Sequence, residues 1–165
     1  CWETRFGFQR VVQSDWVWPR RGDWMSRLEE FILEQAGPVV LVAHSLGCHL
    51  VAAWAAHSAH GDRILGALLV APPDLEREQI PPNLFNWRPV VRQRLPFPSR
   101  VVASDNDPFA SLQQTQAMAA SWGSELTVLA SFGHLNGESG LGDWPQGLGL
   151  VDDLLAGRVN QSALR

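Results

Sequence analysis

The chain has 165 residues and a formal net charge of −4, with 45% hydrophobic and 18% charged residues. The length suffices for one domain with its own core, and the charge gives no indication of binding to nucleic acid or to an anionic membrane. No apolar run approaches the roughly 18 residues of a membrane span. With two cysteines and no signal-peptide pattern, a reducing cytoplasm is the expected compartment.

Helix and strand patterns alternate along the chain. A helix capped by Asp23 is expected to run to about residue 36, followed by a buried strand that ends at His44 and a helix to about His57. Further strands are expected at 63–73, 99–108 and 124–134, and further helices at 111–123 and 148–159. Apolar strands separated by helices predict a mostly parallel sheet with helices on both faces.

Two features stand apart from this alternation. Residues 74–98 contain five prolines and have no clean period, so we expect an irregular segment that packs through its apolar side chains. Four tryptophans fall within the first 24 residues, and aromatic clusters are usually part of a core. We therefore expect most of these rings to be packed inside, with the lining of an apolar pocket as the alternative. The four residues are Trp2, Trp16, Trp18 and Trp24.

One short turn joins the strand that ends at His44 to the helix that follows. The sequence VVLVAHSLGCHLVAAWAA, residues 39–56, changes from a strand pattern to a helix pattern at Ser45, with no loop residues to spare. Such a turn exposes its central side chain above the edge of the sheet, which is the geometry of a nucleophile elbow. The alternative is that Ser45 only caps the helix.

Candidates for a base and an acid follow two other predicted strands. Asp105 and Asp107 come after the strand at 99–108, and His134 comes at the end of the last predicted strand. The carboxyl ends of parallel strands lie along one edge, so these groups and Ser45 are expected to meet there. The order nucleophile, acid, histidine is that of an α/β-hydrolase. Alternatively, Asp107 shapes an Asp-Pro turn and His134 is a loop histidine.

Other histidines are weaker candidates for the base. His44 precedes the proposed nucleophile, so its side chain is expected to leave in another direction and to pack or to line the site. His49 lies one helical turn deeper than Ser45 and is expected to point away from the sheet edge. Histidines and acids show no spacing typical of metal ligands, so neither a metal nor a cofactor is expected.

Four segments together carry a family resemblance: VAHSLGC, VVASDNDPF, ASFGHLNGESGLGDWPQG and the early ETRFGFQRVVQSDWVWP. They resemble the small serine hydrolases that include retinoblastoma-binding protein 9 and bacterial YdeN, and the similarity runs over nearly the whole chain. It implies a single compact α/β-hydrolase domain over residues 1–165 with little or no cap, and a triad of Ser45, Asp107 and His134. In this family the acid stands immediately before proline, as Asp107 does. Ala43 departs from the glycine of most α/β-hydrolases, although a small side chain is compatible with close packing.

The resemblance also implies a strand and a glycine-containing loop ahead of the tryptophan-rich segment, and these are absent from the chain. We expect the oxyanion hole to take one donor from the backbone N–H of Leu46 and a second from that loop. A strand with its loop takes on the order of 10 to 20 residues, so a segment of this size is expected before Cys1.

The expected activity is hydrolysis of small esters or related acyl substrates through an acyl-enzyme, without a cofactor. Two alternatives use the same scaffold: a thioesterase or acyltransferase with the same triad, and a protein that binds a partner, since a fold does not determine a function. The expected ligand is a small acyl or ester compound. Neither nucleic acid nor a membrane is expected as a partner, and the sequence does not indicate a protein partner.

Overall fold

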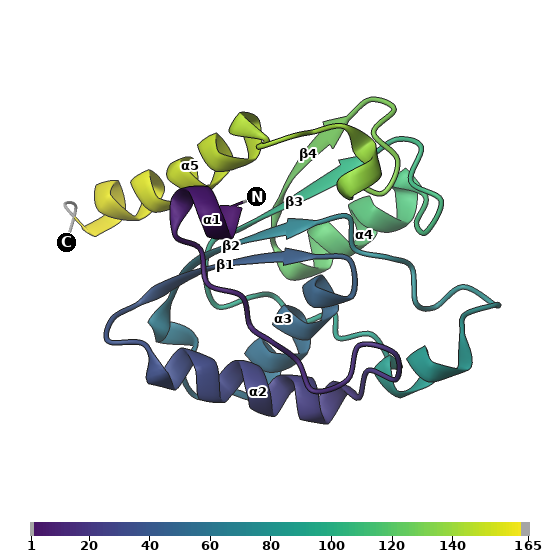
Figure 1. The fold of residues 1–165 in the computed structure, drawn as a ribbon, viewed down its shortest axis with the longest axis horizontal. Coiled ribbons are helices and arrows are strands. Elements are labelled where there is room, and N and C mark those ends of the chain that lie inside the picture. Colours follow the sequence, from purple (N-terminus) through teal and green to yellow (C-terminus); the bar gives the residue numbers. More distant parts are fainter. Residues whose placement is uncertain (1, 163–165) are drawn as a thin grey trace.

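A computed structural model describes residues 2–162, with the side chains of residues 2–156; Cys1 and residues 163–165 lie outside this range. Its centre is a sheet of parallel strands in the order β1-β2-β3-β4 (Figure 1). The strands are β1 (Val39–His44), β2 (Ile64–Val70), β3 (Ser99–Ser104) and β4 (Glu125–Leu129). Because all four run in the same direction, their carboxyl ends lie along one edge of the sheet.

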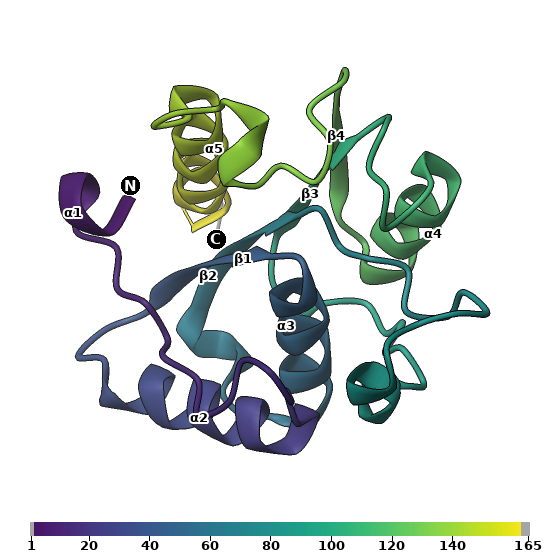
Figure 2. The same cartoon turned by 45° about the vertical axis from the view of Figure 1, so that its right-hand side comes forward.

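Helices cover both faces of the sheet (Figure 2). On one face lie α2 (Arg21–Glu34), α3 (Leu46–His57) and α4 (Leu112–Trp122). On the other face lie α5 (Pro145–Ser162) and the short α1 (Trp2–Phe6). Among residues 2–162, no helix combines the length and the apolar character needed to cross a bilayer. The parallel sheet with helices on both faces confirms the predicted α/β architecture.

Successive side chains of β2 point to opposite faces of the sheet and belong to two separate layers of the core. Ala67 and Leu69 belong to the apolar cluster with α2, α3 and α4, whereas Leu68 and Val70 belong to the cluster with α5. All four residues are at most 3% exposed. A strand that is buried on both faces has to be apolar at every position, which explains its continuous hydrophobic sequence.

Most predicted elements are present, with small differences at their ends. The helix expected from Asp23 instead begins at Arg21, and its N-cap is Arg20, which makes no side-chain capping bond. α4 follows the prediction closely, because the Ser111 side chain accepts from the backbone N–H of Gln114 and Gly123 ends the helix with φ of 68°. β4 ends at Leu129, five residues before His134, so the loop that carries this histidine is longer than expected.

The first strand is not buried as its sequence predicts. Within residues 2–162, β1 pairs only with β2, and none of its six residues is buried. Val42 is 38% exposed. The apolar run is typical of a strand with neighbours on both sides, but in the part of the chain that the structure describes no strand pairs with the outer edge of β1.

The irregular segment and the tryptophans are only partly packed. Ile80 and Trp87 of the 74–98 segment are buried, and the turn Pro82–Trp87 is a 3-10 helix. Trp24 is 5% exposed, but Trp16 and Trp18 are more than half exposed, so the prediction that most of the early tryptophans lie inside is wrong for these two. The ring of Trp16 packs edge-on against Trp24 at 5.2 Å, outside the core.

Candidate active site

Ser45 stands alone between a strand and a helix. β1 ends at His44 and α3 begins at Leu46, and Ser45 between them has φ of 55°. Its backbone N–H donates to the carbonyl of Val70 at 2.8 Å, which continues the pairing with β2. Its side chain makes no capping bond to α3, so the capping alternative does not account for this serine. A positive φ at a residue other than glycine is uncommon and is typical of functional turns.

Two small residues allow the turn to be this tight. A Cβ atom added to Gly47 would lie 3.5 Å from the Cβ of Ala43, which is ordinary van der Waals contact. The strand and the first turn of the helix therefore approach closely with alanine at position 43. The departure from glycine noted in the sequence leaves the elbow intact.

The structure brings Ser45, His134 and Asp107 together at the carboxyl edge of the sheet. The Nε2 atom of His134 lies 2.9 Å from the Oγ of Ser45. On the other side of the ring, Nδ1 lies 2.9 Å from Oδ2 and 3.1 Å from Oδ1 of Asp107. The side chain of His134 is 11% exposed and that of Asp107 is 5% exposed. With Nδ1–H donating to the carboxylate, Nε2 is left to accept the proton of the serine hydroxyl.

The two candidate carboxylates have different partners. Besides the imidazole, Asp107 accepts the backbone N–H of Phe109 through Oδ1 at 2.8 Å. Asp105 accepts the backbone N–H of Ser131 at 2.8 Å, whereas the described hydrogen bonds of His134 Nδ1 go to Asp107. The structure therefore places Asp107, and not Asp105, against the histidine.

The loop that carries His134 is tied to the loop that carries Asp107. Oγ of Ser104 accepts the N–H of Phe132 at 2.9 Å, and Oδ1 of Asn106 accepts the N–H of Gly133 at 2.7 Å. With the bond from Ser131 to Asp105, three successive N–H groups are held by side chains at the end of β3. Ser104 and Asn106 are not among the residues expected from the sequence, where their only signal is polar character next to the two aspartates.

His44 and Phe109 both pack edge-on against the His134 ring. The centroid of the Phe109 ring is 4.5 Å from that of His134, and the centroid of the His44 ring is 4.9 Å from it. His44 also donates from Nε2 to the backbone carbonyl of His134 at 2.8 Å. The pKa of His44 is lowered because desolvation beside this loop disfavours the charged ring, and the hydrogen bond to the His134 carbonyl offsets this only in part. The site-lining role expected of His44 is thus what the structure shows.

Two further residues of α3 are buried behind the elbow. The thiol of Cys48 donates to the carbonyl of Val70 at 3.3 Å, and burial raises its pKa, so it remains protonated. His49 donates from Nε2 to the carbonyl of Pro73 at 2.7 Å and packs edge-on against Trp122, away from Ser45 as predicted. Its Nδ1 has no hydrogen-bond partner, and burial lowers its pKa to about 4.

We expect the burial of His49 to make the protein less stable in mild acid. The unfolded chain takes up this proton near pH 6.5, whereas the folded protein takes it up only near pH 4. The stability present above pH 6.5 is therefore lost progressively down to about pH 4, by about 3 kcal/mol in total. Urea unfolding of the wild type and of His49→Gln at pH 7 and pH 4.5 measures this loss. The variant keeps a donor for Pro73 and should lose less stability on acidification.

The matched control for this prediction is His57→Gln. His57 belongs to the same helix and bonds the carbonyl of Ala53 at 2.8 Å, but it is solvent-exposed. This variant should show the same dependence on pH as the wild type. An equal acid-induced loss in the wild type and in His49→Gln would contradict the assignment to His49.

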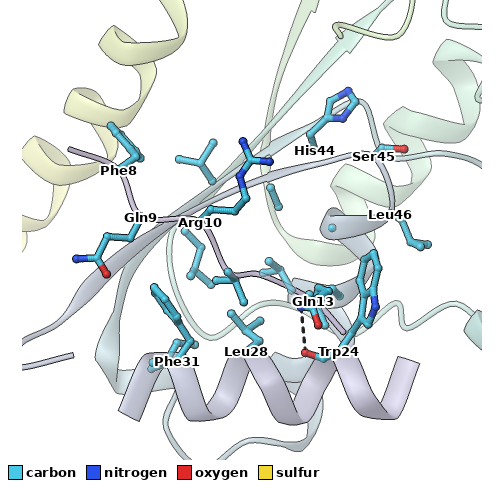
Figure 3. Close-up of a pocket in the computed structure, with 18 of the residues that line it drawn as sticks. Phe8, Gln9, Arg10, Gln13, Trp24, Leu28, Phe31, His44, Ser45 and Leu46 are labelled. Atoms are coloured by element: carbon cyan, nitrogen blue, oxygen red, sulfur yellow. Dashed lines mark hydrogen bonds between the residues drawn. The ribbon is translucent and has the colours of Figure 1, made fainter. Parts of the chain in front are cut away.

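A pocket of about 930 Å³ extends along the outer edge of β1 and ends at Ser45 and Leu46 (Figure 3). Trp24, Leu28 and Phe31 of α2 line one side of it, and Phe8, Gln9 and Arg10 of the segment between α1 and α2 line another. One side is the strand edge itself, which presents backbone donors and acceptors as well as apolar side chains. Among the residues that the structure describes, no group of three or more His, Cys, Asp or Glu side chains is arranged to hold a metal ion.

Comparisons with known proteins bear on the family and the fold of the chain. A family model described as "Serine hydrolase" matches residues 1–153. A protein of Pectobacterium atrosepticum described as a YdeN-like hydrolase is 29% identical, with a TM-score of 0.81 over 94% of this chain and 80% of that one. The ydeN gene product of Bacillus subtilis is 19% identical, with a TM-score of 0.67 over 87% of this chain and 80% of that one.

A monoacylglycerol lipase of Paleococcus ferrophilus is 12% identical, with a TM-score of 0.64 over 84% of this chain and 76% of that one. The Bacillus and Paleococcus proteins show a shared fold alone. A search of curated proteins gave no match. The family match spans most of the chain and confirms the resemblance found in the sequence. The chain belongs to the serine hydrolase family.

Proposed function

We propose that the protein hydrolyses small esters or related acyl compounds, with Ser45 as the nucleophile, His134 as the base and Asp107 as the acid of the triad. The observation that carries this proposal is the chain of contacts from Asp107 through both ring nitrogens of His134 to the Ser45 hydroxyl. A serine hydroxyl is a weak nucleophile unless a base accepts its proton, and here the base is already within hydrogen-bond distance.

In the first half of the reaction, Oγ of Ser45 attacks the acyl carbon while its proton moves to Nε2 of His134. The carboxylate of Asp107 fixes the ring tautomer and stabilises the imidazolium. When the tetrahedral intermediate collapses, the bond to the leaving alcohol breaks and the alcohol takes the proton from Nε2. A water molecule then repeats the sequence on the acyl-enzyme, releases the acid and restores Ser45.

The negative oxygen of the intermediate needs hydrogen-bond donors. Leu46 is the first residue of α3, directly after Ser45, where backbone N–H groups have no partner within the helix. We assign one oxyanion donor to its N–H, and the positive end of the helix dipole reinforces this interaction.

The test is covalent labelling of the purified protein with a fluorophosphonate, followed by mass mapping of the adduct. We expect one adduct, on Ser45, and turnover of p-nitrophenyl esters that depends on acyl length. A parallel series of acyl thioesters tests the thioesterase alternative, which predicts higher kcat/KM for thioesters than for esters of the same acyl chain. An adduct on another residue, or no adduct and no turnover of either series, would overturn the proposal.

A further inference from the structure

The proposed base is held by its neighbours at the ring and at the backbone. The ring nitrogens of His134 bond Asp107 and Ser45, and the rings of His44 and Phe109 both pack edge-on against it. The backbone around it is unusual, because Ser131, Gly133 and Leu135 all have positive φ. Such a backbone keeps its shape only where the surrounding contacts determine it.

These contacts hold the two sides of His134 differently. Ahead of the histidine, the N–H groups of residues 131–133 donate to side chains at the end of β3. At the histidine itself, the carbonyl accepts a hydrogen bond from Nε2 of His44 at 2.8 Å. This bond comes from another part of the sheet, the end of β1, next to Ser45.

His44 is itself well placed by the sheet. It is the last residue of β1 and pairs in register with Val70 of β2, and the following N–H, that of Ser45, donates to the Val70 carbonyl. The donor to the His134 carbonyl, His44, and the proposed nucleophile, Ser45, are therefore consecutive residues at the end of β1. The contact between the rings of His44 and His134 at 4.9 Å would by itself be a packing interaction. The hydrogen bond that His44 donates to the His134 carbonyl also sets the position of the His134 backbone relative to Ser45.

We propose that His44 is a positioning residue that keeps His134 in line with Ser45 by donating its Nε2–H to the backbone carbonyl of His134. The inference rests on the proposed function, in which His134 takes the proton of Ser45. Without the donor, the loop can shift while Asp107 still holds the ring. A displacement of about 1 Å between reacting groups can lower a rate by roughly 100-fold.

The experiment compares His44→Phe with His44→Gln. Phenylalanine keeps a ring beside His134 but has no donor, whereas the glutamine amide can donate to the same carbonyl. We expect kcat for p-nitrophenyl acetate to fall roughly tenfold to 100-fold in His44→Phe, with KM changed less than threefold, and most of kcat to return in His44→Gln. His57→Phe serves as a control, because His57 also bonds a backbone carbonyl but lies at the far end of α3.

A second measurement does not depend on turnover. The proton shared by Nδ1 of His134 and Asp107 should give a low-field proton NMR resonance. We expect it to be sharp in the wild type and in His44→Gln, and broadened by exchange with water in His44→Phe. The melting temperatures of the variants show whether a loss of rate merely follows a loss of stability.

The outcomes separate the two proposals. Equal kcat in the wild type and His44→Phe, or equal losses in both variants together with a lower melting temperature, would overturn the positioning role. If the wild type neither reacts with fluorophosphonate nor hydrolyses any ester or thioester, the proposed function fails. The NMR comparison then still decides whether His44 holds His134 in place.

Discussion

Replacing Ser45 with alanine should lower ester turnover by roughly 10⁴- to 10⁶-fold and abolish labelling by fluorophosphonate. The substitution removes only the hydroxyl group, and the one described partner of this hydroxyl is Nε2 of His134. The fold should therefore be preserved, because the backbone bond from Ser45 to Val70 does not involve the side chain. Steady-state kinetics, adduct mapping and thermal unfolding of the same preparation measure the three expectations.

Ser121→Ala is a matched control for this variant. The Ser121 hydroxyl bonds the carbonyl of Ala117 on the exposed side of α4, so its loss should leave turnover and labelling unchanged. Labelling that persists in Ser45→Ala would show that another residue is the nucleophile.

Replacing Asp107 with asparagine should lower kcat by on the order of 10³- to 10⁴-fold, with KM changed only a few-fold. The amide NH₂ of asparagine can donate to Nδ1 of His134, which holds the ring in the tautomer that carries its proton on Nε2. That nitrogen can then no longer accept the proton of Ser45. The measurement is kcat and KM for one p-nitrophenyl ester across pH 6 to 9.

Asp105→Asn is the natural comparison for Asp107→Asn. The Oδ1 of Asp105 accepts the N–H of Ser131, and an asparagine oxygen can accept the same bond. This variant should retain most of the turnover. If Asp105→Asn is the severe change and Asp107→Asn the mild one, then the wrong carboxylate has been assigned.

The candidate residues of the site could be selected from the sequence because each of them comes after a predicted strand. Ser45 lies between two clear patterns, and Asp107 and His134 each follow a short segment with a strand pattern, although only the strand before Asp107 is mostly buried. The parallel order then brings all three to one edge. The choice of Asp107 over Asp105 came from the family pattern and not from the residues alone.

Other features of the structure depend on contacts that a sequence does not display. An apolar run such as Val39–Val42 reads the same whether a strand has one neighbour or two, so the exposure of β1 could not be predicted. Trp16 and Trp18 carry no local signal of exposure. The bond from His44 joins residues 90 positions apart, and neither periodicity nor spacing indicates it.

The ties between the loops after β3 and β4 have a mechanical consequence. Three hydrogen bonds tie the segment 131–133 to the end of β3. The loops that carry the proposed acid and base therefore form one hydrogen-bonded body. Ser45 belongs to a second body, formed by β1 and α3, and β2 lies between the two. The strand before the nucleophile, β1, and the strand before the acid, β3, are therefore two strand spacings apart, roughly 10 Å. The imidazole of His134 bridges the side chains of Ser45 and Asp107 across this separation.

A sliding of β1 relative to β3 would consequently change the distance between Ser45 and His134 but not the distance between His134 and Asp107. The contact between His134 and Asp107 lies within one body and would be preserved, whereas the 2.9 Å contact between Ser45 and His134 crosses from one body to the other. The bond from His44 crosses the same boundary beside it and resists the same displacement. The alignment of the nucleophile thus depends on the stiffness of the central strand.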